Sequence, residues 1–306
     1  MTIAMDASNK QAVAQAMAEP ATRSVAGHWH ARLELQFSHT PRGTRLVKAV
    51  HEGPLYVQKP FYPEGPDLAH VYPLHPPGGM VSGDELQIAV QATENAQALM
   101  TTPGAARVYR ARPDRKPQKQ RVTLQVGPNA SLEWLPLENI IYPDAEACLQ
   151  TRVELAPGGR FIGWEVTSLG LPASGQTFAK GQLRQRFMVF REGRPVFIDK
   201  LGLMQQTRAL YAANVGLQSQ PINGVFVAGP FAQGEAAELL ELLRHQITTE
   251  PTRPYLAGIS VCGEFLVGRY LGGCSEQGRE LFVRWWTSVR PALLDRAACP
   301  PRIWLT

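Results

Sequence analysis

The sequence predicts a mainly β protein with a small α+β part at its C-terminal end. Before residue 220, apolar and polar side chains alternate in many short segments, and Gly-rich turn signals separate these segments every ten or so residues. After residue 230, two segments have helical periodicity. Many short strands with regular turn chemistry are typical of an all-β body.

Strands are predicted where the period of two is regular, because such segments place one apolar face against a core. The predicted strands of the body are residues 29–37, 45–50, 86–90, 121–126, 161–166, 185–190 and 195–203. Turn signals such as Gly158-Gly159 and Glu192-Gly193 lie between them.

The last quarter is predicted to contain two helices among three strands. The strands are residues 224–228, 256–261 and 264–271. The first helix spans 235–246, and its early acidic residues suit the positive end of the helix dipole. The second helix spans 280–289, with Leu281, Phe282 and Trp285 on one face, and Pro291 is expected to end it.

The domain organisation is predicted to be simple. Residues 1–25 form a flexible N-terminal extension, and 26–306 form one domain with a β-rich body (26–220) and an α+β part (221–306). The apolar runs are too short to cross a bilayer, and residues 1–24 lack export-signal features. With four cysteines and no C-x-x-C spacing, we expect a cytoplasmic protein with no membrane partner.

A basic segment covers residues 107–121, although the net charge of the whole chain is only +5 and does not indicate a nucleic-acid partner. The segment contains one acid and seven basic residues: Arg107, Arg110, Arg112, Arg115, Lys116, Lys119 and Arg121. It is interpreted as a solvated hairpin loop or as a docking patch for an acidic protein surface. RNA binding ranks third, because Tyr109 alone is available there for base stacking.

Common catalytic motifs are absent from the sequence, which contains no P-loop, no G-x-S-x-G and no H-E-x-x-H. Five acids instead lie between large apolar residues: Asp84, Glu85, Glu133, Glu165 and Asp199. Burying a carboxylate is costly unless it is paired, hydrogen-bonded or hydrated. Each acid is therefore expected in an ion pair or a capped turn, or all of them line a hydrated passage. Oxygen ligands alone would hold a divalent transition metal loosely there.

Six sequence segments carry a family resemblance. They are GPLYVQKPFYPEG and LHPPGGMVSGD within residues 53–84, TTPGAARVYR at 101–110, LEWLPLENIIYPDA at 132–145, GWE at 163–165 and PRIWLT at 301–306. In this order they resemble the UreD family of urease accessory proteins, from about Trp29 to the last residue. The resemblance implies an elongated, β-helix-like stack of short strands with two helices packed on it.

The resemblance also implies a function. UreD proteins are non-enzymatic chaperones that bind the urease apoprotein (UreA, UreB and UreC) and recruit UreF and the GTPase UreG. Nickel then passes through an internal tunnel, so Ni²⁺ is a transient cargo and no cofactor is permanently bound. Two alternatives stay open: a passive adaptor that only bridges proteins, and a hydrolase that uses the acids for acid/base catalysis.

The predicted site residues fall into two groups. Matching the family motifs places acidic tunnel positions at Asp84, Glu165 and Asp199, and we add Glu133 and Glu85 to this predicted nickel path. The predicted partner-binding residues come from the basic segment and from the last predicted helix: Arg107, Arg110, Arg112, Arg115, Trp285 and Trp286.

Overall fold

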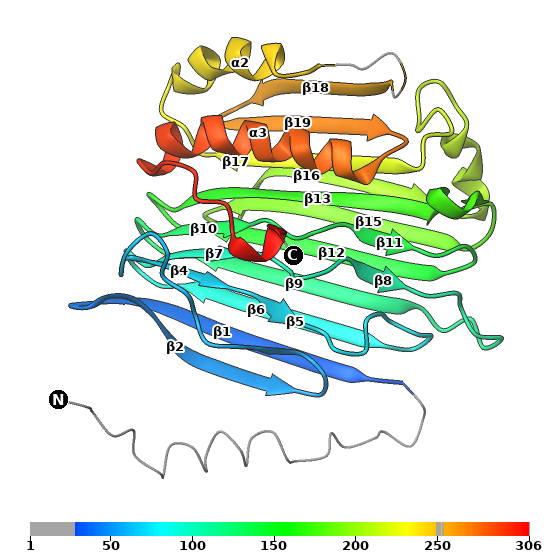
Figure 1. Ribbon diagram of the computed structural model, residues 1–306, viewed down its shortest axis with the longest axis horizontal. Coiled ribbons are helices and arrows are strands. Elements are labelled where there is room, and N and C mark those ends of the chain that lie inside the picture. The colour runs from blue at the N-terminus through cyan, green and yellow to red at the C-terminus, as the bar shows by residue number, and fades with distance from the viewer. Residues whose placement is uncertain (1–27, 249–251, 253, 306) are drawn as a thin grey trace.

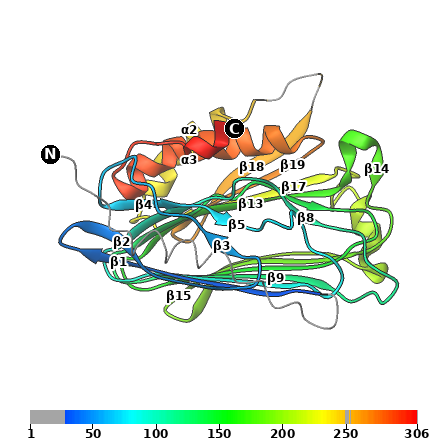
Figure 2. The same cartoon turned by 60° about the horizontal axis from the view of Figure 1, so that its bottom comes forward.

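Two large β-sheets lie face to face, and two α-helices cover the outer face of one of them (Figures 1 and 2). This computed structural model describes residues 28–248, 252 and 254–305. The predicted extension at 1–25 lies outside the described residues.

The first sheet has seven strands in the order β16-β15-β12-β9-β6-β1-β2. Its inner strands pair in parallel, and the two edge strands, β2 and β16, pair antiparallel. The strands are β1 (His30–Thr40), β2 (Gly43–Glu52), β6 (Glu85–Ala92), β9 (Gln118–Val126), β12 (Glu146–Leu155), β15 (Gln182–Arg191) and β16 (Arg194–Leu203).

The second sheet has ten strands, with the main order β18-β19-β17-β13-β10-β7-β4 and with β8, β11 and β14 attached beside it. The strands are β4 (Leu68–Val71), β7 (Gln97–Met100), β8 (Ala106–Val108), β10 (Ser131–Trp134), β11 (Asn139–Ile141), β13 (Arg160–Leu171), β14 (Gln176–Thr177), β17 (Ile222–Gly229), β18 (Tyr255–Cys262) and β19 (Phe265–Gly272). A separate ribbon pairs β3 (Tyr56–Val57) with β5 (Pro73–Leu74). Short 3-10 helices occupy Pro172–Ser174, Gln205–Tyr211 and Arg302–Leu305.

From β6 to β15 the chain repeatedly crosses from one sheet to the other, so β6, β9, β12 and β15 lie in the seven-stranded sheet and the strands between them lie in the ten-stranded sheet. Parallel neighbours need such crossover connections, which here run through the opposite sheet. The mainly β prediction is confirmed, since 47% of the described residues are in strands and 16% are in helices. The elongated, β-helix-like stacking stays a prediction.

Alternation explains which side chains fill the space between the sheets. In β1, Leu33, Leu35 and Phe37 are at most 2% exposed and point inward, while the residues between them are more exposed. The same pattern in β12 was not predicted, because its inward row includes the polar Thr151. Strand β13 is buried on both faces along nearly its whole length, so its burial does not alternate from residue to residue.

The C-terminal quarter contains the predicted α+β elements, but its strands are not a separate appendage. Strands β17, β19 and β18 extend the ten-stranded sheet beyond β13. Helix α2 (Glu235–His245) and helix α3 (Ser275–Leu294) pack on the outer face of that sheet.

The prediction that Pro291 ends the second helix is wrong. Helix α3 continues through Pro291 to Leu294, where Asp295 adopts a left-handed conformation and donates its N–H to the Pro291 carbonyl. Proline removes one backbone donor, but this loss falls in the last turn, where Leu293 is still buried against the core.

Helix α3 approaches the sheet closely because the sheet presents a glycine beneath it. A Cβ atom at Gly268 of β19 would lie 2.3 Å from the Trp285 ring, so this position has room for hydrogen only. Both Trp285 and Trp286 are 0% exposed. The apolar face of α3 therefore packs on the chain's own sheet.

Candidate functional site

A buried carboxyl group lies between the two sheets. Glu165 of β13 is 5% exposed and points toward the seven-stranded sheet, where Thr151 and Gln185 donate hydrogen bonds to it, the latter at 2.8 Å. Thr167 donates to the other end of the Gln185 amide at 3.1 Å. Burial raises the pKa of Glu165 to about 7, the two hydrogen bonds oppose that rise, and the charge of Asp199 adds to it. Within the described residues, Glu165 forms no ion pair.

Asp199 lies at an opening between the two sheets. It lines a cleft of about 680 Å³ whose walls come from β16, β18, β19 and the turn at residues 215–217. Its carboxylate forms an ion pair with Arg269 of β19, with Nη1 and Oδ1 2.7 Å apart. The sequence indicated Asp199 but not this basic partner, which lies 70 positions further along the chain.

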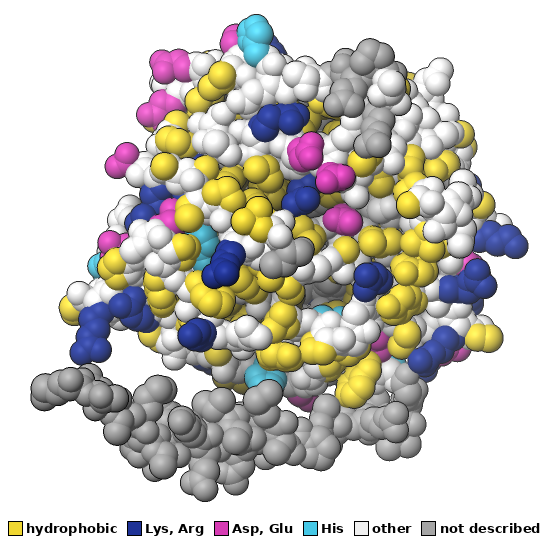
Figure 3. Space-filling view, viewed as in Figure 1, with side chains coloured by type: hydrophobic (Ala, Val, Ile, Leu, Met, Phe, Trp, Pro, Cys, Tyr) yellow, Lys and Arg dark blue, Asp and Glu magenta, His cyan; other side chains and the backbone are white. Residues whose placement is uncertain are grey.

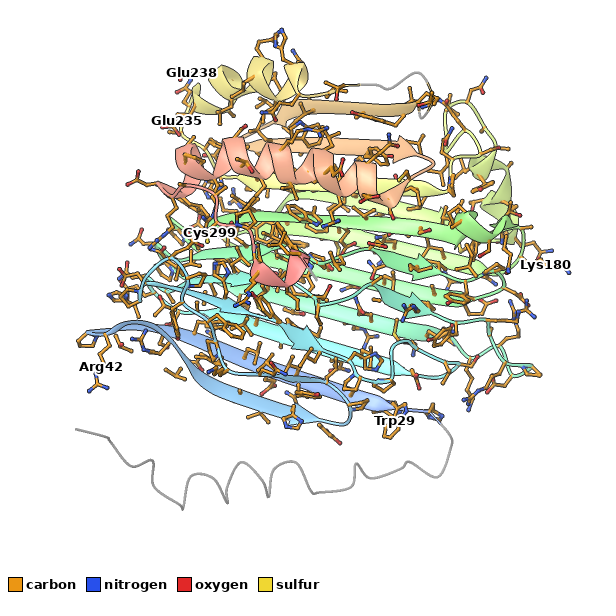
Figure 4. All side chains as sticks on the ribbon, in the orientation of Figure 1. Trp29, Arg42, Lys180, Glu235, Glu238 and Cys299 are labelled. Carbon is orange, nitrogen blue, oxygen red and sulfur yellow. The ribbon has the colours of Figure 1, made fainter. Side chains whose placement is uncertain are left out.

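The acids at the start of β6 have local structural partners. Both oxygens of Asp84 accept backbone N–H groups, from Trp29 at 2.7 Å and from Val81 at 2.8 Å, so this buried residue closes a turn. Figure 4 places Trp29 next to the start of β1. Glu85 forms an ion pair with Lys119 of the neighbouring strand β9. Asp84 thus lies in a capped turn and Glu85 in an ion pair, the two structural arrangements that the sequence left open as an alternative to a hydrated passage.

Glu133 belongs to a buried ion network under α3. Arg290 of α3 donates to it from Nε at 3.0 Å, and Trp286 donates from Nε1 at 2.6 Å. The same guanidinium binds Glu64 through two nitrogens at 2.7 and 2.8 Å. His70 contacts Glu64 at 2.7 Å. Burial raises the pKa of the Glu133 carboxyl, and the Arg290 guanidinium opposes that rise.

The basic segment lies on the surface but does not form a hairpin. It connects β8 in one sheet to β9 in the other, so its ends are not paired strands. Arg107, Arg110, Arg112 and Arg115 are exposed. Arg115 forms ion pairs with Asp144, at 2.7 Å, and with Glu146. The segment's role as a docking patch stays a prediction.

Trp285 and Trp286 are both buried, at 0% exposure, and their role in binding a partner stays a prediction. Trp285 donates its N–H to the Leu243 carbonyl at 3.0 Å, which joins α3 to α2. Trp286 binds Glu133 as described above. Figure 3 shows that other hydrophobic side chains are spread over the middle of the face that carries α3.

Sequence reasoning missed the polar partners that define the site. These partners come from segments distant in sequence from the acids they contact, and they are Thr151, Gln185, Arg269 and Arg290. The available signal was the polar residue at an inward position of an alternating strand, as at Thr151 and Gln185. This signal can be used only if it is known which alternate residues of a strand face inward, and the sequence alone leaves this uncertain for β12.

No ready-made metal cage accompanies these acids. Among residues 28–248, 252 and 254–305, no group of three His, Cys, Asp or Glu side chains is placed to hold a metal ion.

Across the same residues, no helix has both the length and the apolar character required to span a membrane.

The fold and the site together define a mainly β protein with a buried carboxyl group between its sheets. A sequence model described as UreD urease accessory protein matches residues 30–305. The chain is 46% identical over 287 residues to the urease accessory protein UreD of Marinomonas sp. (strain MWYL1), covering 92% of this chain and 91% of the relative. It is 38% identical to the UreD of Psychromonas ingrahamii, covering 94% and 97%, and 39% identical to UreD 2 of Brucella anthropi, covering 91% and 98%. The chain belongs to the UreD urease accessory protein family.

Proposed function

We propose that this chain is a urease maturation chaperone that binds the urease apoprotein, recruits UreF and UreG, and passes Ni²⁺ between them through its interior. Membership of the UreD family supports the urease role. The observation that supports conduction is Glu165, a carboxyl group between the sheets whose contacts are the neutral Thr151 and Gln185. It is an accessory protein and not an enzyme, and it works in the cytoplasm.

The proposed path rests mainly on Glu165, whose contacts are neutral, and on Asp199, whose basic partner Arg269 has an exposed side chain. A carboxylate without a basic partner has electrostatic capacity left for a cation, and oxygen donors bind Ni²⁺ weakly enough to release it. Asp84, Glu85 and Glu133 are engaged by backbone N–H groups or by basic side chains, so their contribution to the path requires those partners to move.

The test compares urease activation by Glu165→Gln and Asp199→Asn with activation by wild type. We expect both variants to co-purify with urease and UreF but to give a lower fraction of nickel-loaded, active urease. Glu154→Gln is the matched control, because Glu154 lies on the outward face of β12 and pairs with Arg152 at the surface. Normal activation by both path variants would support a passive adaptor instead.

One observation favours acid/base catalysis as a second candidate, namely the raised pKa of Glu165. A carboxyl group that titrates near neutral pH can donate and accept protons, although at 5% exposure Glu165 is shielded from substrates. Hydrolysis of p-nitrophenyl acetate with a midpoint near pH 7, lost in Glu165→Gln, would favour this candidate. A rate equal to that of the variant would eliminate it for this ester.

A further inference from the structure

A row of three residues crosses the ten-stranded sheet toward its open edge. Glu165 of β13 is paired with Val225 of β17, and Val225 is paired with Arg269 of β19. Directly paired residues on neighbouring strands project from the same side of a sheet. Glu165 and Val225 face the interior between the sheets, so Arg269 leaves the sheet on that side also.

A second row lies opposite, on the seven-stranded sheet. Thr151 of β12 is paired with Phe187 of β15, and Phe187 is paired with Asp199 of β16. The two rows meet at both ends, because Thr151 donates to Glu165 and Arg269 pairs with Asp199. The inner end is buried, and the outer end opens into the 680 Å³ cleft.

The outer ion pair differs from the buried network under α3 in how easily it can separate. The side chain of Arg269 is 53% exposed and that of Asp199 is 15% exposed, so the arginine covers the acid from the solvent side. An exposed guanidinium can move into water without losing its hydration, and exposed ion pairs contribute little net stability. Arg290, in contrast, is 0% exposed and is held by two glutamates.

We infer that Arg269 is a displaceable counter-ion, which a divalent cation entering from the cleft replaces on Asp199. The cleft between β16 and β18 is then the port through which the cargo reaches the row that ends at Glu165. This inference rests on the proposed function and adds to it a port and a residue that controls it. Phe187 and Val225 lie between the port and Glu165. Both side chains are apolar and buried, at 1% and 3% exposure, so this part of the path is apolar.

The experiment titrates NiCl2 alone into the full-length chain by isothermal calorimetry at low ionic strength. Arg269→Gln is expected to bind Ni²⁺ roughly two- to fivefold more tightly than wild type, which is the factor an exposed ion pair is worth. Asp199→Asn removes that site. Arg269→Lys keeps a cation but lacks the planar fork, so its affinity is expected between those of wild type and Arg269→Gln.

Arg191→Gln is the matched control, because Arg191 is another exposed arginine paired with a single glutamate, Glu264, and its loss changes the net charge equally. If Arg269→Gln binds Ni²⁺ no more tightly than Arg191→Gln, the counter-ion role of Arg269 is overturned. The proposed nickel conduction still stands in that case if Asp199→Asn and Glu165→Gln impair urease activation. If those two variants bind and activate normally, the proposed function itself fails.

Discussion

At the residue scale, Glu165 is a buried carboxyl group held by the neutral side chains of Thr151 and Gln185. Its pKa is raised from 4.5 to about 7 by burial, so between these values the folded chain keeps a proton that the unfolded chain has released. Its contribution to stability is fully present below pH 4.5 and is lost as pH rises to 7. Above pH 7 the charged form stays buried at a constant cost.

Glu165→Gln is therefore expected to flatten this part of the pH profile. A rise of this size corresponds to on the order of 3 kcal/mol, most of which is lost between pH 5 and pH 8. Over this range the free energy of unfolding should therefore fall by about 2–3 kcal/mol less in the variant than in wild type. Urea unfolding at the two pH values measures the difference. The outward-facing control Glu154→Gln should keep the wild-type profile, and parallel profiles for Glu165→Gln and wild type would contradict the assigned pKa.

Another residue-level contrast lies in Glu64, which is also partly buried but is paired. Burial would raise the pKa of Glu64, yet hydrogen bonds from His70 and Arg290 lower it to about 2. Its stabilisation is present above pH 4.5 and is lost only as pH falls toward 2. The two carboxyls thus respond to pH in opposite directions, because one has basic partners and the other has neutral ones.

At the element scale, α3 is attached to the sheet by packing and by one buried charge network. Its face contributes Leu281, Phe282, Trp285 and Val289 to the outer core, all at 0% exposure. Arg290 continues this face and binds Glu133 of β10 and Glu64 of the loop before β4. The helix therefore ties the N-terminal half of the chain to the C-terminal strands β17 and β19, on which it also packs.

Arg290→Met should destabilise the protein by about 3–5 kcal/mol, because it leaves Glu133 buried without its counter-charge. Adding Glu133→Gln should recover part of this loss, since the uncompensated charge is then removed. Denaturant unfolding of the single and double variants measures both effects. Equal stabilities of Arg290→Met and the double variant would show that the buried charge is not the cause.

At the scale of the whole molecule, the C-terminal segment closes contacts between distant parts of the chain. Trp304 donates its N–H to Thr101 at 2.8 Å, across 203 positions of sequence. Its ring also packs near Trp164 and Trp286, with centroids 5.9 and 5.8 Å away. In Figure 4, Cys299 marks this segment as it leaves α3 and runs down the face of the ten-stranded sheet.

Trp304→Ala is expected to lower the free energy of unfolding by roughly 1–3 kcal/mol, less than a fully buried tryptophan would, because the residue is only half-buried. The midpoint of denaturant unfolding measures this change. Leu305→Ala is the control, since Leu305 is 87% exposed and should change stability by no more than about 0.5 kcal/mol. Equal effects of the two substitutions would mean that the segment is not anchored through Trp304.

Local pattern predicted much of the fold, and the exceptions have physical causes. Strands with one apolar face, such as β1 and β9, were predicted within a few residues of their observed bounds. Strand β10 was missed because its four residues are all buried and show no alternation. The end of α3 was misplaced because tertiary burial of Leu293 outweighs the bond lost at Pro291.

The amino-acid sequence by itself determined the mainly β class, the two C-terminal helices and the family, because these follow from local periodicity and short motifs. Only the tertiary structure decided which acids are paired. Arg290 reaches Glu133 across 157 positions and Arg269 reaches Asp199 across 70, and an ion pair depends on distance in space. Among the described residues, Glu165 has neutral contacts only, because the crossing between sheets places Thr151 and Gln185 opposite it.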